Sequence, residues 1–278
     1  MIIKKWKLFL EELVGETEIS DTKLYIKSME MSIQDKLFFI ENVDFDVIVD
    51  FGCANGTFLS KVKLIKPDVK IIAYDTDHLM LQASREILNN SEALITNNWS
   101  EIANELKKYK SPLLNLSSVI HEVYSYSNSD EIKKFWNEQV FNNNFKWIVI
   151  RDMIPSSNLE TNNNFKADAI KVRKRANKFF LNSFEKRWGS IDDNYKTLCH
   201  FLLKYRYVVN WDREVTENYL PVNLEYLKSK IPSGYSITFE DSFNVPFIQN
   251  TIIKDFGVRL QYPTHLKMII KNNNLWNT

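Results

Sequence analysis

The sequence has few cysteines and few glycines: two and six among 278 residues. Cys53 and Cys199 cannot form a disulfide framework or a Cys-only metal site, and a chain of this length buries enough core without cross-links. We therefore expect a reducing compartment and no metal site.

The sequence also lacks a long apolar run. None reaches the roughly 20 residues that a membrane-spanning helix needs. Near the start, Trp6, Phe9 and Leu13 are spaced like one face of an amphipathic helix, and two glutamates interrupt the stretch where a signal peptide would stay apolar. These features predict a cytoplasmic chain with no membrane segment.

An excess of charge of one sign is missing as well. The chain has 36 Lys and Arg against 35 Asp and Glu, a net charge of +1, which excludes a global polycation. Residues 165–188 are the exception, with eight Lys or Arg against two acidic residues, a local charge of +6. This segment is either a phosphate-binding surface, with Arg173 and Arg175 on it, or an ordinary solvated helix face.

Short β-branched runs alternate with helical periodicity in the middle of the chain, which predicts a parallel sheet with helices on both faces. Two later strands would close the sheet as an antiparallel pair, and YRYVVNW at 205–211 is ambiguous. The expected strands are 46–51, 69–75, 93–96, 112–120, 146–153, 235–243 and 265–271, with helices at 57–66, 78–89, 99–109 and 130–141.

Three parts follow from this pattern. Residues 1–42 are expected to be an N-terminal helical segment. Residues 43–154 and 235–278 are expected to form a Rossmann-like domain. Residues 155–234 are expected to be a helical insert. It would act as a lid over a ligand site at the end of the sheet and would contact the molecule that accepts the transferred group.

Two of the six glycines, Gly52 and Gly56, lie in the segment VDFGCANGTFL between a predicted strand and a predicted helix. Glycine permits positive φ and a close approach of backbone to a ligand, and the helix N-terminus offers unpaired N–H groups. Asp75 ends the next strand, where an acid can accept hydrogen bonds from a ribose diol. The sequence therefore predicts a cofactor that contains a nucleoside.

The spacing Gly52-x-x-x-Gly56, with Ala54 between, matches the dinucleotide fingerprint G-x-G-x-x-G poorly. Asp50, just before the turn, would repel a phosphate but suits a cationic group. A sulfonium that carries an α-amino group is such a ligand.

Residues 49–56, VDFGCANG, resemble the first motif of class I S-adenosylmethionine-dependent methyltransferases, usually written D/E-x-G-x-G-x-G, with Ala54 at the central glycine. The resemblance implies an α/β fold with a doubly wound, mostly parallel seven-stranded sheet and a final antiparallel strand. It also implies S-adenosylmethionine as cofactor. The residues that it implies for cofactor binding are Asp50, Gly52, Cys53, Ala54, Asn55, Gly56, Asp75, Thr76, Asn98, Trp99 and Ser117.

Two of these residues, Asn98 and Cys53, also have simpler structural interpretations. Asn98 and Trp99 follow the third strand, where the family places residues against the adenine, but Asn98 is equally expected as a turn or helix-cap residue. Cys53 is most simply a small turn residue.

The segment SSVIHEVYSYS at 117–127 is expected beside the transferred methyl group, with His121, Glu122 and Tyr124 as catalytic candidates. His121 suits a general base near neutral pH, or is a packed histidine hydrogen-bonded to backbone. Arg151 and Asp152, after the fifth strand, are either pocket residues or an internal ion pair.

The chain has no Asn/Asp-Pro-Pro-aromatic motif after the fourth strand, which argues against base N-methylation by that route. The sequence therefore favours methyl transfer to an oxygen or nitrogen atom of a small metabolite. One alternative is an RNA or other nucleic-acid methyltransferase that uses the basic segment. A second is a catalytically silent cofactor-binding subunit that contacts a partner protein.

Overall fold

The computed structural model describes residues 33, 35–89, 91–162 and 164–274. The chain divides into two units after Phe38, and the fold and the candidate site belong to residues 39–278. In the first unit, Ile33, Asp35 and Lys36 are helical. Residues 37–42, the end of the predicted N-terminal helical segment, form turns and not a helix. Residues 1–32 and 34, with Trp6, Phe9 and Leu13, lie outside the described residues.

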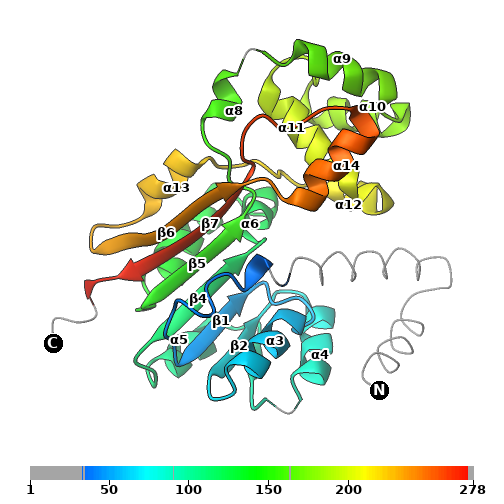
Figure 1. Ribbon diagram of the computed structural model, residues 1–278. Coiled ribbons are helices and arrows are strands. Elements are labelled where there is room, and N and C mark those ends of the chain that lie inside the picture. Colours follow the sequence, from blue (N-terminus) through cyan, green and yellow to red (C-terminus); the bar gives the residue numbers. More distant parts are fainter. Residues whose placement is uncertain (1–32, 34, 90, 163, 275–278) are drawn as a thin grey trace. The chain divides into compact units, whose positions relative to one another are not determined.

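One sheet of seven strands runs through the described part of residues 39–278 (Figure 1). Its order is β3-β2-β1-β4-β5-β7-β6, with β1 to β5 parallel and β7 antiparallel to both of its neighbours. The predicted doubly wound, mostly parallel seven-stranded sheet with a final antiparallel strand is confirmed. The strands are β1 Val47–Phe51, β2 Lys70–Tyr74, β3 Leu94–Thr96, β4 Pro112–Ser117, β5 Trp147–Asp152, β6 Tyr235–Phe243 and β7 His265–Asn272.

The strand order reverses between β1 and β4, which pair in parallel with Asp50 opposite Asn115. In open α/β sheets, ligands bind outside the carboxyl ends of the strands at such a switch point. The fold therefore places the β1–α3 turn and the residues after β4 at the expected binding edge.

Three of the helices that connect the first five strands, α4, α5 and α7, begin at residues whose side chains cap them. Asp77 accepts hydrogen bonds from the backbone N–H groups of Leu79 and Met80 at the start of α4, and Asn128 forms a capping box with Glu131. The helix expected over 130–141 is divided into an α-helix and a π-helical segment. These elements are α3 Thr57–Ile65, α4 His78–Ile87, α5 Trp99–Leu106, α6 Ile120–Tyr126, α7 Ser129–Lys134 and the π-helix η1 Phe135–Val140.

Residues 155–234 are helical in the described range. The ambiguous segment 205–211 is not a strand, since it forms a 3-10 helix that runs into α12, and a further helix, α14, separates the two closing strands. No described helix combines the length and hydropathy needed to cross a membrane. The elements are α8 Asn158–Thr161, α9 Lys166–Arg175, α10 Lys178–Trp188, α11 Tyr195–Lys204, η2 Tyr205–Asn210, α12 Trp211–Glu214, α13 Leu224–Lys230 and α14 Pro246–Phe256.

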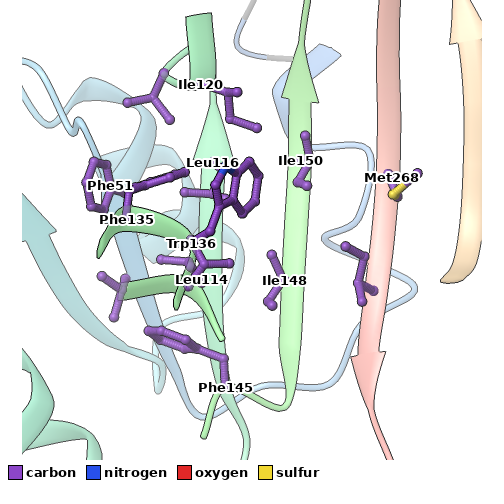
Figure 2. Packing of buried hydrophobic residues seen from close by; sticks show 14 of the residues in the cluster. Phe51, Leu114, Leu116, Ile120, Phe135, Trp136, Phe145, Ile148, Ile150 and Met268 are labelled. Carbon is purple, nitrogen blue, oxygen red and sulfur yellow. The ribbon is translucent and has the colours of Figure 1, made fainter. Parts of the chain in front are cut away.

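A first hydrophobic cluster lies on one face of the sheet. Figure 2 shows Leu114 and Leu116 of β4 beside Ile148 and Ile150 of β5, with Trp136 packed over them. All five residues of β1 are buried, as expected for a parallel strand covered on both faces.

A second hydrophobic cluster joins the insert to α14, through residues such as Phe184, Phe201 and Phe256. Helices α9, α10, α11 and α14 gather beyond the end of the sheet at which β4 and β5 end (Figure 1). Because the insert and α14 share a buried core, they form one packed unit beyond that end of the sheet.

Candidate functional site

The turn between β1 and α3 has three residues in the left-handed region: Gly52 at φ 75°, Ala54 at φ 47° and Gly56 at φ 76°. A Cβ at Gly52 would lie 3.0 Å from Val119 Cγ2, and one at Gly56 would lie 3.1 Å from Ser84 Oγ. Glycine is therefore required at both positions, by conformation and by the close approach of neighbouring side chains.

Asp75 ties this turn to the end of β2. Its Oδ2 accepts a hydrogen bond from the backbone N–H of Ala54 at 2.9 Å, and its Oδ1 accepts one from the N–H of Asp77 at 2.9 Å. Burial raises the pKa of Asp75, although these N–H groups oppose the rise. The residue is half-buried and its neighbour Thr76 is exposed, so this carboxylate lies at the surface of the turn.

Asp50 points into a buried polar chain. Asn115 Nδ2 donates to Asp50 Oδ1 at 2.7 Å, and Ser117 Oγ donates to Asn115 Oδ1 at 3.0 Å. Asn115 is fully buried and was not among the residues expected from the sequence. A lone asparagine within the apolar run PLLNLSSVI was the available signal, because a buried amide needs partners.

At the position expected to contact the adenine, the structure places a helix-capping residue, Asn98. Asn98 Oδ1 accepts a hydrogen bond from the backbone N–H of Ser100 at 3.0 Å, so this side chain caps α5. Trp99 packs its ring against Phe51 and Tyr74, with centroids 5.5 and 5.2 Å apart. Its indole N–H is buried and has no hydrogen-bond partner among the described residues.

Two small residues complete the turn. Burial raises the pKa of the Cys53 thiol, the nearby Asp50 adds to the rise, and the thiol lies 3.6 Å from Ser84 Oγ. Such a thiol stays protonated and unreactive. Asn55 Oδ1 accepts a hydrogen bond from the N–H of Thr57 at 3.1 Å and so supports the first turn of α3.

His121 and Asp152 form a buried pair at the ends of β4 and β5. His121 Nδ1 lies 2.7 Å from Asp152 Oδ1, and Asp152 Oδ2 accepts a hydrogen bond from the N–H of Ile120 at 2.7 Å. Burial opposes charge on the ring, but Asp152 and the carboxylates of Glu122 and Glu217 outweigh it and raise the pKa of His121. His121 and two backbone N–H groups lower the pKa of Asp152 to about 2, against the effect of burial.

Glu217, from the insert, faces the other side of the His121 ring, with its Oε2 3.9 Å from Nε2. Its Oε1 accepts hydrogen bonds from Arg213 Nε at 3.0 Å and from the Tyr126 hydroxyl at 2.9 Å. Arg213 Nη2 also lies 2.9 Å from Glu122 Oε1. We call His121, Glu122, Asp152, Arg213 and Glu217 the acceptor-side cluster.

Sequence reasoning missed Glu217 and Arg213, because they lie far along the chain from β4. A buried lysine fixes the backbone of this part of the insert. Lys204 is completely buried and donates hydrogen bonds to the backbone carbonyls of Glu214 and Glu217. Burial lowers the pKa of Lys204 to about 7.

The other candidates lie around this cluster. Tyr124 turns away to Tyr226, with hydroxyl oxygens 3.3 Å apart, and accepts a hydrogen bond from Trp136 Nε1 at 3.0 Å. Arg151 is buried, and its Nη1 lies 3.4 Å from Ser118 Oγ.

The two arginines of the basic segment that were expected to bind phosphate, Arg173 and Arg175, both contact other residues of the protein. Arg173 Nη2 pairs with Glu185 Oε1 at 2.5 Å and with Asp192 Oδ2 at 2.6 Å. A Cβ at Gly257 would lie 3.0 Å from the Arg175 guanidinium, which therefore packs against the end of α14.

Neither a protein-family model nor a curated protein matches the sequence. Among solved structures, the chain is similar to the plantazolicin methyltransferase BamL in complex with a triazolic desmethylPZN analog and SAH, at 13% identity and a TM-score of 0.45, over 96% of this chain and 96% of that one. The plantazolicin methyltransferase BpumL in complex with SAH matches at 11% identity and a TM-score of 0.45, over 99% and 100%.

An O-methyltransferase family protein from Burkholderia thailandensis matches at 12% identity and a TM-score of 0.43, over 93% of this chain and 61% of that one. At such identities the activities of these proteins do not transfer to this chain by similarity.

Proposed function

We propose that this chain is an S-adenosylmethionine-dependent methyltransferase that acts on an oxygen or nitrogen atom of a small molecule. The observation that carries the proposal is the position of Val119, which lies next to both the turn after β1 and the acceptor-side cluster. This residue packs against the Gly52 turn, and His121 follows it by two positions at the start of α6. A cofactor on the turn would therefore lie next to the acceptor-side cluster.

The residues at the turn fit this cofactor. Gly52 and Gly56 hold the turn in the left-handed conformation at the N-terminus of α3, and Asp75 presents a carboxylate for a ribose diol. The buried Asp50 carboxylate supplies negative charge for a cationic ligand, and Asn115 orients it. When bound, S-adenosylmethionine supplies an activated methyl group on a sulfonium.

The acceptor-side cluster supplies polar groups on the side of Val119 away from the turn. His121 is fixed by Asp152, and its Nε2 has no hydrogen-bond partner among the described residues. An acceptor that binds there meets an oriented nitrogen atom and the carboxylates of Glu122 and Glu217. Methyl transfer requires in-line approach and exclusion of water more than covalent help from the protein, and the burial of His121, Asp152 and Glu217 serves the second requirement.

The insert closes the acceptor side, since Glu217, Arg213 and Tyr219 all come from it. The Tyr219 ring lies 5.6 Å from the His121 ring, centroid to centroid. Residues 155–234 thus act as the wall or lid over the acceptor, and residues 43–154 with the closing strands hold the cofactor.

A small acceptor is favoured over RNA by the state of the basic segment. Arg173, which the RNA alternative requires for phosphate binding, is paired with two carboxylates. Its guanidinium is therefore already neutralised, and a phosphate would have to compete with both acids.

The proposal is tested by calorimetric titration of the full chain with S-adenosylmethionine, beside Asp75→Ala, followed by labelled methyl transfer into fractionated cell extract. We expect binding by the natural sequence, at least tenfold weaker binding by the variant, and label in the small-molecule fraction. Equal binding by both proteins, or none by either, contradicts the cofactor site. Label in RNA contradicts the acceptor class. Cofactor binding with no transfer into any fraction supports the silent subunit.

A further inference from the structure

We propose that His121, Glu122 and Glu217 bind a divalent metal cation that holds a hydroxyl oxygen of the acceptor. This inference rests on the proposed function and deepens it, because it assigns the acceptor class. The sequence predicted no metal site, since Glu217 joins the other two residues only through the fold.

The three side chains offer a set of ligand atoms of the right size. One atom from each, the imidazole nitrogen and two carboxylate oxygens, lies within 4.8 Å of the others. Three ligand atoms around one cation with bonds of roughly 2.1 Å lie about 3–3.6 Å from one another, so the atoms here must move closer by about 1 Å. Small side-chain rotations therefore bring the three atoms into coordination distance.

The histidine is already oriented as a ligand. Asp152 Oδ1 lies 2.7 Å from Nδ1, which fixes the proton on that nitrogen and leaves the Nε2 lone pair directed at Glu217. A carboxylate on the far nitrogen is the usual second partner of a metal-binding histidine. The His121 side chain is 93% buried, with 7% of its surface exposed, and Nε2 has no hydrogen bond among the described residues. Nε2, which faces Glu217, is therefore available to a ligand.

The carboxylates of Glu122 and Glu217 are also held by hydrogen bonds from neighbouring side chains. Arg213 binds Oε1 of both Glu122 and Glu217, and the Tyr126 hydroxyl also donates to Oε1 of Glu217. The second oxygen of Glu217, Oε2, lies 3.9 Å from His121 Nε2. Arg213 therefore helps to position both carboxylates beside the histidine.

The acceptor-side cluster holds more acidic than basic side chains. Asp152, Glu122 and Glu217 face the single guanidinium of Arg213 around the His121 ring. A divalent cation would offset this excess of carboxylates. One imidazole with two carboxylates suits first-row ions such as Mn²⁺ and Zn²⁺.

A cation here would act on a hydroxyl acceptor. The oxygen coordinates the metal, which lowers the pKa of the hydroxyl so that its proton passes to water. The oxygen then forms a bond to the methyl carbon while the carbon–sulfur bond breaks and its electron pair stays on sulfur. The inference thus narrows the acceptor to a molecule with a hydroxyl group.

The test is titration of the full chain with Mn²⁺ after removal of metals, followed by electron paramagnetic resonance in the absence of cofactor, with Zn²⁺ as competitor. We expect one Mn²⁺ per chain, displaced by Zn²⁺. Glu217→Gln and His121→Ala should each weaken binding at least tenfold, whereas the exposed control Glu138→Gln should not change it. Glu122→Gln, at a half-buried position, repeats the test if either buried variant fails to fold.

Absence of stoichiometric Mn²⁺ binding, or equal affinity in the natural sequence and the ligand variants, overturns the metal site. Methyl transfer that survives a chelator then supports His121 as the base. Cofactor binding is measured separately, so its failure contradicts the proposed function without affecting the metal readout.

Discussion

The backbone N–H of Ala54 donates a hydrogen bond to Asp75 Oδ2 over 2.9 Å, so the turn after β1 and the end of β2 are held together. Ala54 makes this contact from φ 47°, a conformation that costs a residue with a Cβ roughly 1–2 kcal/mol. The carbonyl of Ala54 also accepts a hydrogen bond from Ser84 Oγ at 2.7 Å, which ties α4 to the same turn. These contacts offset the strain of an alanine where the family motif has glycine.

Ala54→Gly should therefore stabilise the fold. Relief of the left-handed strain exceeds the added entropy of glycine in the unfolded chain, and we expect a gain of about 0.5–1 kcal/mol in the free energy of unfolding. Denaturant titration measures it, with Gly52→Ala as the opposite control, because its Cβ would meet Val119 at 3.0 Å. A loss of stability in Ala54→Gly would show that the alanine methyl group packs favourably in the turn.

Asp75 should make cofactor binding sensitive to acid. A ribose diol donates to the ionised carboxylate, so the affinity for S-adenosylmethionine is full at high pH and falls as pH drops through the pKa of Asp75. Burial raises that pKa above its ordinary value of 3.8, so the fall begins at a higher pH than for an exposed aspartate. Dissociation constants measured from pH 7 downward test this. Asp75→Asn should bind weakly with no such dependence, and an identical slope in the variant would assign the effect to another group.

Asn115 should be critical for stability because it pairs with Asp50 in the interior. Asn115→Asp places a second carboxylate at the 2.7 Å contact and should cost about 3 kcal/mol or more, since one of the two acids must be protonated. Ser117→Ala removes only the outer hydrogen bond and should cost about 1 kcal/mol. Thermal unfolding compares the two, and equal losses would mean that Asp50 is not ionised.

Arg173 should contribute to the stability of the fold and not to substrate binding or methyl transfer. Arg173→Ala removes pairs with Glu185 and Asp192 that are one-fifth to two-fifths exposed, so we expect a loss of about 1 kcal/mol. Methyl transfer and affinity for RNA should stay as in Lys186→Ala, an exposed control on α10. A selective loss of RNA affinity in Arg173→Ala would restore the nucleic-acid alternative.

Much of the fold follows from local patterns in the sequence. The strands have the expected positions to within three residues, because β-branched runs and helical periodicity are properties of short segments. The segment 205–211 was ambiguous because its aromatic residues suit a strand, whereas tertiary packing makes it helical. The helix α14 was not predicted, although Pro246 at its first turn was a signal.

The turn between β1 and α3 was also predictable, because its glycines and Asp75 lie within a short stretch of chain and its conformation depends on residues without a Cβ. What the sequence could not provide is the acceptor-side cluster. His121, Asp152 and Glu217 come from three distant segments, and their contacts depend on how the insert packs against the ends of β4 and β5. The sequence by itself thus determined the sheet and the turn after β1. Only the tertiary structure decided that a buried histidine would face two glutamates, because side-chain distances between remote segments are set by packing and not by periodicity.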